Sequence, residues 1–199
     1  MRAGIRVLNR RTLVAELLKS RGDSLVVTGL GSPTYDAAAA GDDARNFYLW
    51  GAMGSAAMVG FGLALAQPER RIVVITGDGE LLMGIGSLAT IAVQKPGNLA
   101  ILVLDNEAFG ETGRQAGLTG QGVDLCGVAR AAGFAAARLI EHDNDVSALA
   151  ELLFRAPGPA LGVAKVGLEA DPLVLPARDG RYLTQRFRIA LLGPEHAVS

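Results

Sequence analysis

Gly77-Asp78-Gly79 and Asn106 are the residues of this chain whose types and spacing best suit metal chemistry. Each follows a short apolar run rich in β-branched residues, Ile72 to Thr76 and Leu99 to Leu104 respectively. The segment between the runs is largely apolar and of helical length, so the unit is expected to be strand, helix and parallel strand. The Asp78 carboxylate and the Asn106 amide would then meet where two neighbouring strands end. Such oxygens can share one hard cation with a phosphate group.

Four glycine-bearing turns follow expected strands and therefore lie on one edge of the sheet. They are Gly29–Ser32, Gly51–Gly54, Gly77–Gly79 and Asn106–Gly113. Glycine lets backbone N–H groups approach an anion closely, and a helix N-terminus adds its dipole. Neither a G-x-G-x-x-G motif nor a P-loop is present. Because a carboxylate repels a phosphate, the aspartate implies a diphosphate bridged by Mg²⁺. Taken alone, Gly-Asp-Gly is equally well explained as a tight turn with a capping aspartate.

The other segments continue the alternation of strands and helices. Strands are expected at residues 24–28, 46–50, 72–76, 99–104, 134–140 and 160–166, and helices at 12–19, 33–40, 51–67, 80–94, 124–132 and 145–155. This order predicts an α/β fold, a doubly wound, mostly parallel six-stranded sheet with helices on both faces. The long polar stretch Asn106–Gly122 is expected to be a functional loop.

The expected domain covers residues 1–167, with residues 1–20 as a leading helix. Residues 168–199 are expected to be a tail with a helix at Tyr182–Leu192, which either packs on the sheet or reaches a partner. The stretch Phe47–Ala66 carries no charge over 20 residues, the length of a membrane span, but its glycines favour a buried strand and helix.

Composition limits the classes of protein to consider. The net charge of −1 offers no electrostatic case for nucleic acid or an anionic membrane, and 50% hydrophobic residues exclude global disorder. Cys126 is the single cysteine, the N-terminus shows no signal peptide, and a cytoplasmic setting is expected. His142 and His196, the two histidines, lie outside the glycine turns and are expected at the surface.

The spacing of the metal-binding candidates resembles a family signature. Residues 80–105, 26 in all, separate Gly-Asp-Gly from Asn106, which resembles the signature of thiamine diphosphate-dependent enzymes. The resemblance implies that the side chains of Asp78 and Asn106 and the backbone carbonyl of Ala108 bind Mg²⁺, and that the cation holds the cofactor's diphosphate. Asp105 stands where the family often has a first asparagine, a departure that leaves the ligand itself in place.

Two further segments resemble parts of the same family. Trp50-Gly51-Ala52-Met53-Gly54 resembles the segment of thiamine-dependent decarboxylases and acetolactate synthases that holds the aminopyrimidine. That implies a carbonyl contact from Gly51 and a bulky wedge from Met53, which alone would be read as a core methionine. Phe109–Gln115 resembles sulfopyruvate decarboxylase β subunits and half of phosphonopyruvate decarboxylases, with Arg114 in place of a glycine. The resemblance covers residues 20–166.

The resemblance implies a function. The chain would be the cofactor-binding β subunit of a two-subunit 2-oxoacid decarboxylase, a carboxy-lyase using thiamine diphosphate and Mg²⁺ that converts sulfopyruvate- or phosphonopyruvate-like acids to an aldehyde and CO₂. The glutamate that activates the cofactor in this family belongs to a pyrimidine-binding domain. No catalytic residue is therefore assigned to this chain, and an α-type partner subunit is expected to supply that glutamate. Arg114 could face the anionic end of the substrate or be a solvated loop arginine.

The expected cofactor contacts come from the four turns. They are Gly29, Ser32, Gly51, Met53, Gly77, Asp78, Gly79, Glu80, Asn106, Phe109, Gly110, Glu111 and Thr112. The charge of Glu80 suits a helix N-terminus but not a nearby diphosphate, and the sequence does not explain it. The alternatives are a subunit of a carboligase or a 2-oxoacid oxidoreductase, a non-catalytic cofactor-binding subunit, and a flavodoxin-like nucleotide binder.

Overall fold

The computed structural model describes residues 8–168, 171–195 and 197. Its strands are β1 (Leu25–Thr28), β2 (Asn46–Tyr48), β3 (Ile72–Gly77), β4 (Leu99–Asp105), β5 (Ala108–Phe109), β6 (Gln115–Ala116), β7 (Ala136–Ile140) and β8 (Ala160–Lys165). Its helices are α1 (Arg10–Leu18), α2 (Ser32–Ala39), α3 (Ala56–Ala66), α4 (Asp78–Met83), α5 (Ser87–Gln94), α6 (Leu125–Ala132), α7 (Val146–Phe154) and α8 (Gly180–Leu192). Residues 1–7 of the expected leading helix and His196 lie outside the described residues.

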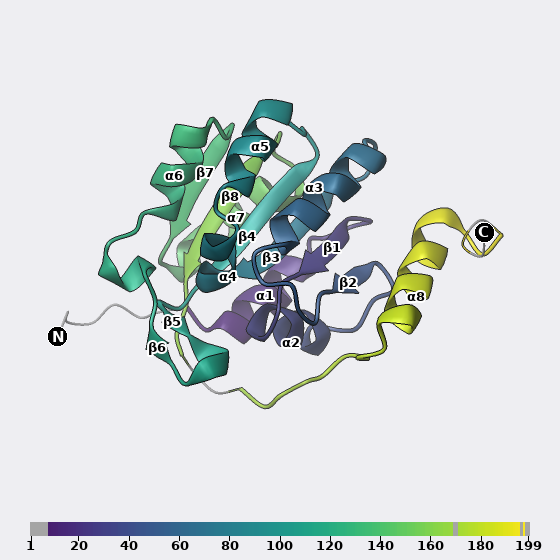
Figure 1. The fold of residues 1–199 in the computed structure, drawn as a ribbon, viewed down its shortest axis with the longest axis horizontal. Coiled ribbons are helices and arrows are strands. Elements are labelled where there is room, and N and C mark those ends of the chain that lie inside the picture. Colours follow the sequence, from purple (N-terminus) through teal and green to yellow (C-terminus); the bar gives the residue numbers. More distant parts are fainter. Residues whose placement is uncertain (1–7, 169–170, 196, 198–199) are drawn as a thin grey trace.

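Six strands form one parallel sheet in the order β2-β1-β3-β4-β8-β7, which confirms the predicted fold class (Figure 1). Every residue of β4 is buried, as expected for a parallel strand covered on both faces. The strand order reverses between β1 and β3. In open parallel sheets, ligands bind at this switch point, outside the carboxyl ends of the strands.

Helices cover both faces of the sheet and make two apolar cores. On one face α1, α2 and α7 contribute side chains such as Val14, Ala37 and Leu149. On the other face α3, α4, α5 and α6 do so, with Phe61 and Ile91 among the buried residues. Alternate strand residues point into the two cores, so the sheet is held rigidly and its carboxyl edge is a fixed platform for the turns.

Three expected elements have different boundaries in the structure. The predicted helix 80–94 is two helices, α4 and α5, because the chain turns at Gly84–Gly86. The helix expected from Gly51 begins only at Ala56, after a loop in which Ala52 and Gly54 have positive φ angles. The loop 106–122 contains a small antiparallel hairpin, β5 with β6, and two 3-10 turns.

The C-terminal part of the chain runs back across the carboxyl edge of the sheet. Arg11 Nη2 donates to the Pro172 carbonyl at 3.0 Å, and Trp50 Nε1 donates to the Ala177 carbonyl at 2.8 Å. The Arg178 guanidinium lies 5.1 Å from the centroid of the Trp50 ring. We call residues 171–179 the strap. It connects the end of the sheet at β8 with α8, which lies at the β2 edge (Figure 1).

Helix α8 packs against β2. The rings of Phe47 and Phe187 are 5.3 Å apart, and Arg186 pairs with Asp42 at 2.6 Å. Among the described residues, no helix has the length and apolar character needed to cross a membrane. The uncharged stretch 47–66 is instead strand, loop and helix α3. The expectation of a fully buried helix was wrong, because only one face of α3 packs on the sheet, and Leu65 on the other is 53% exposed.

Candidate functional site

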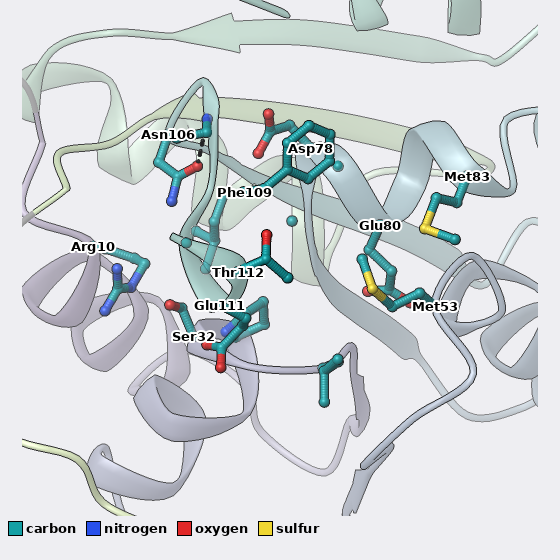
Figure 2. Close-up of a pocket in the computed structure, with 17 residues that line it drawn as sticks. Arg10, Ser32, Met53, Asp78, Glu80, Met83, Asn106, Phe109, Glu111 and Thr112 are labelled. Carbon is teal, nitrogen blue, oxygen red and sulfur yellow. Dashed lines mark hydrogen bonds between the residues drawn. The ribbon is translucent and has the colours of Figure 1, made fainter. Parts of the chain in front are cut away.

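A cavity of about 240 Å³ opens at the carboxyl ends of β1, β3 and β4 (Figure 2). All the expected cofactor contacts line it except Gly29 and Gly51, and the proposed metal ligand Ala108 lines it too. Because Gly77 of β3 pairs with Leu104 of β4, the two strands end side by side. The structure therefore brings the predicted residues together at the predicted edge.

Asp78 is a buried carboxylate, 2% exposed, at the first position of α4. It makes no ion pair among the described residues. Burial, followed by the charge of Asp105, raises the pKa of the Asp78 carboxyl, and a hydrogen bond from Thr119 at 3.0 Å opposes the rise. A buried acid without a cationic neighbour is costly, and a bound cation would remove that cost.

Asp105, the departure from the family pattern, is not one of the described residues that line the cavity. Its carboxylate pairs with Lys165 at 2.8 Å and accepts from the backbone N–H of Glu107 at 3.1 Å. The Thr119 hydroxyl lies 2.7 Å from Asp105 and also reaches Asp78, so one proton serves two carboxylates. Asp105 thus has its own positive partner, and Asp78 has none in the part of the chain that the structure describes.

Asn106 and Phe109 are positioned by tight local packing. Asn106 Oδ1 accepts from the backbone N–H of Ala108 at 3.0 Å, and the intervening Glu107 has a φ of 59°. A Cβ on Gly79 would lie 2.7 Å from the Phe109 ring. Gly79 therefore lets the loop after β4 close over the start of α4. Backbone strain at a non-glycine residue is typical of functional sites.

The structure explains the unusual Glu80. The side chain is buried and accepts from the backbone N–H of Ala56 at 3.2 Å and from the Thr76 hydroxyl. Burial raises the pKa of the Glu80 carboxyl, while these hydrogen bonds oppose the rise. Glu80 thus lines the cavity, but its carboxylate accepts a hydrogen bond from the N-terminus of α3. It ties the loop that carries Met53 to helix α4.

The loop 51–55 is held against the end of α4 by contact between two glycines. A Cβ on Gly84 would overlap the Gly54 carbonyl, and a Cβ on Gly54 would lie 3.0 Å from the Gly84 nitrogen. Gly54 also has a φ of 90°, which other residues rarely adopt. This contact breaks the predicted single helix and fixes the position of Met53, which is 40% exposed.

A Gly84→Ala substitution is expected to move the loop 51–55 away from the cavity. The expected result is a loss of about 1–3 kcal/mol in the free energy of unfolding, as for overpacking, together with weaker binding of ligands that contact Met53. Urea unfolding measures the first effect, and calorimetry with the cofactor that the sequence resemblance implies measures the second. Gly86→Ala is the control, because a Cβ there would meet no atom of the described residues within 4 Å. Equal stability of the two variants would contradict the contact.

Arg10, Thr119 and Lys165 belong to the site but were not predicted. Lys165 ends β8, so the strand-end rule that identified Asn106 could also have found it. Arg10 begins α1, a helix that runs antiparallel to the following strand and so starts at the carboxyl edge. No local signal marks Thr119. Arg114 lies outside the main cavity and lines a neighbouring one of about 210 Å³.

The fold and the site define a thiamine diphosphate-binding domain. Residues 31–162 match the family described as "Thiamine pyrophosphate enzyme, C-terminal TPP binding domain", and the chain belongs to that family. The match spans the turns of the cavity, from the start of α2 to β8.

Particular decarboxylases are similar to this chain. The sulfopyruvate decarboxylase subunit beta of Methanothermobacter thermautotrophicus is 44% identical over 64% of this chain and 68% of that subunit. The phosphonopyruvate decarboxylase of Streptomyces viridochromogenes is 41% identical over 78% of this chain, which spans only 38% of that enzyme. Benzoylformate decarboxylase from Polynucleobacter necessarius has the same fold, with a TM-score of 0.73 at 18% identity over 87% of this chain and 35% of that one.

Proposed function

We propose that this chain is the cofactor-binding subunit of a two-subunit 2-oxoacid decarboxylase that acts on sulfopyruvate or a phosphonopyruvate-like acid and releases CO₂ and an aldehyde. The observation that carries the proposal is the meeting of Asp78 and Asn106 in one cavity at the strand ends. The names of the relatives, decarboxylases of two closely similar 2-oxoacids, support the reaction and the substrate class.

The residues of the cavity fit a Mg²⁺–diphosphate group. Asp78 offers a buried carboxylate without an ion-pair partner among the described residues, and Asn106 and Ala108 line the same cavity with further oxygen donors. Oxygen ligands that leave room for phosphate are what Mg²⁺ requires. We therefore assign Mg²⁺ to the Asp78 and Asn106 side chains and the Ala108 carbonyl.

When bound, thiamine diphosphate supplies the carbon nucleophile and the electron sink for decarboxylation. The protein then has to hold, orient and enclose it. Met53 and Met83 lie on the opposite side of the cavity from Asn106 in Figure 2, and they form an apolar wall for the non-phosphate end. Phe109 packs over Gly79, and we assign it the role of covering the diphosphate end.

A partner subunit is part of the proposal. Two glutamates line the cavity. Glu80 is bonded to the start of α3, and Glu111 lies beside Ser32, away from Met53 and Met83, in Figure 2. The group that protonates and deprotonates the cofactor's pyrimidine is therefore assigned to an α-type subunit with a pyrimidine-binding domain. The "subunit beta" names of relatives support this arrangement. We also propose a cytoplasmic setting, consistent with the unpaired, buried Cys126.

Substrate turnover tests the proposal. The chain assembled with its partner is expected to release CO₂ from sulfopyruvate or phosphonopyruvate, in a reaction that requires thiamine diphosphate and Mg²⁺, and to form the matching aldehyde. Pyruvate and benzoylformate serve as comparison substrates. Cofactor binding without any CO₂ release would favour a non-catalytic subunit, and formation of acetolactate from pyruvate would favour a carboligase. Arg114→Ala is expected to weaken the binding of the substrate, because we assign that side chain to its anionic end.

A further inference from the structure

Arg10 is a buried arginine that has donor capacity left over. It is 8% exposed at the first position of α1, and its Nε and Nη2 bond the carboxylate of Asp36. Arg11 bonds the same carboxylate at 2.7 Å. The remaining nitrogen of Arg10, Nη1, makes no hydrogen bond among the described residues. Asp36 thus holds the Arg10 guanidinium in place without using all its donors.

Arg10 faces the cavity that contains Asp78 and Asn106. It is the one basic side chain among the described residues that line this cavity. Figure 2 shows Arg10 on the side of Ser32 and Asn106, away from Met53 and Met83. It therefore lies at the diphosphate end of the proposed cofactor position.

The lining of the cavity holds more acidic than basic side chains, so a bound diphosphate needs positive partners. Asp78, Glu80 and Glu111 are the acidic side chains of the lining, against one arginine. A diphosphate adds several negative charges, and one Mg²⁺ offsets only part of them. The free donor of a buried arginine is a strong partner for phosphate oxygen.

Glu111 occupies the corner beside Arg10. Its carboxylate lies 2.6 Å from the position that a Cβ on Gly31 would take, at the start of α2. Helix α2 has no side-chain cap among the described residues, so the N–H groups of its first turn remain able to bind a phosphate oxygen. Burial and then the Glu111 charge raise the pKa of the Tyr35 hydroxyl, which places the carboxylate within electrostatic reach of α2. The Glu111 carboxylate, although exposed, thus lies beside the position that suits a ligand anion.

We propose that Arg10 binds the terminal phosphate of the cofactor through Nη1, and that Glu111 holds this corner until the cofactor enters and displaces it. The inference rests on the proposed binding of thiamine diphosphate and Mg²⁺ by this cavity. In this assignment, Arg10 makes the site bind thiamine diphosphate more tightly than thiamine monophosphate.

Calorimetry on the full chain assembled with its partner tests the assignment of Arg10. With Mg²⁺ present, Arg10→Gln is expected to weaken thiamine diphosphate binding at least about tenfold, the size of one charge-assisted hydrogen bond. Thiamine monophosphate, measured by displacement, lacks the terminal phosphate and should bind the variant and the wild type equally. Arg11→Gln is the matched control, because Arg11 shares Asp36 but does not line the cofactor cavity.

A second pair of variants separates binding from folding. Arg10→Gln combined with Asp36→Asn avoids a half-paired buried carboxylate and should show the same loss of diphosphate affinity.

Glu111→Gln is expected to tighten diphosphate binding a few-fold, because it removes the competing anion. Unchanged diphosphate affinity in Arg10→Gln, or equal losses for both ligands, would overturn the role of Arg10. A wild-type complex that binds neither ligand would instead refute the proposed function itself.

Discussion

Replacing Asp78 by asparagine is expected to abolish Mg²⁺-dependent binding of thiamine diphosphate while leaving the fold intact and slightly more stable. Changes to residues that merely support a metal ligand already cost about 10–100-fold in affinity. Removal of the charged ligand itself should cost more than about 100-fold. The folded state of the unliganded variant should be more stable than that of the wild type. In the wild type, Asp78 is a buried carboxylate with no ion-pair partner among the described residues. Relief of such functional-site strain is worth about 0.5–2 kcal/mol.

The gain in stability should depend on pH in a defined direction. The folded state raises the pKa of Asp78 above its ordinary value of 3.8. A carboxyl of this kind destabilises the folded protein above its folded pKa and not below its unfolded pKa. The difference in melting temperature between Asp78→Asn and the wild type should therefore be positive near pH 7 and disappear as the pH falls below 3.8.

Thermal unfolding without cofactor and calorimetry with Mg²⁺ and thiamine diphosphate measure the two effects. Asp105→Asn is the matched control at the neighbouring strand end. Because Asp105 pairs with Lys165, its loss should lower the melting temperature. If Asp78→Asn also lowered it, or retained cofactor binding, the assignment of Asp78 as a metal ligand would be wrong.

The purified chain without its partner is expected to show no decarboxylation, and activity should appear when the partner subunit is added. The glutamates of the cavity, Glu80 and Glu111, contact other parts of this chain. The apolar wall of the cavity is open, since Met53 is 40% exposed and Met83 is 65% exposed. A pyrimidine-binding domain that covers this wall would supply the missing glutamate and enclose the cofactor.

Titration of the chain with the partner, followed by CO₂ release, measures this dependence. Met83→Arg is expected to raise the partner concentration needed for half-maximal activity at least about tenfold, because a charge would be buried at the contact. Leu139→Arg is the control, since Leu139 is 49% exposed on β7 at the opposite end of the sheet from β2. Full activity of the chain alone would refute the need for a partner.

The fold was predictable because its signals are local. Apolar runs such as Ile72 to Thr76 and Leu99 to Leu104 mark buried parallel strands, and helical segments separate them. The meeting of Asp78 with Asn106 followed from the same reasoning, since parallel strands end at one edge. Side-chain packing decides which residues line the cavity, and sequence spacing does not encode that packing. Gly29 and Gly51 were expected to line it and do not.

Other features depend on contacts between distant segments. The break at Gly84 exists because Gly54, thirty residues earlier, approaches its backbone. Glu80 looked out of place beside a diphosphate because its partner, the backbone N–H of Ala56, lies at the start of another helix. Arg10 could be assigned to the cavity only after the antiparallel direction of α1 was known. Such tertiary contacts override local propensity.

The strap gives the protein an intrinsic optical reporter. Trp50 is the single tryptophan of the chain, and it immediately precedes Gly51 of the loop that carries Met53. Its indole nitrogen is bonded to Ala177 of the strap, and Arg178 lies over its ring. Any rearrangement of the loop or the strap changes the surroundings of this one fluorophore. Emission at a single wavelength can therefore follow cofactor entry and partner docking in unlabelled protein.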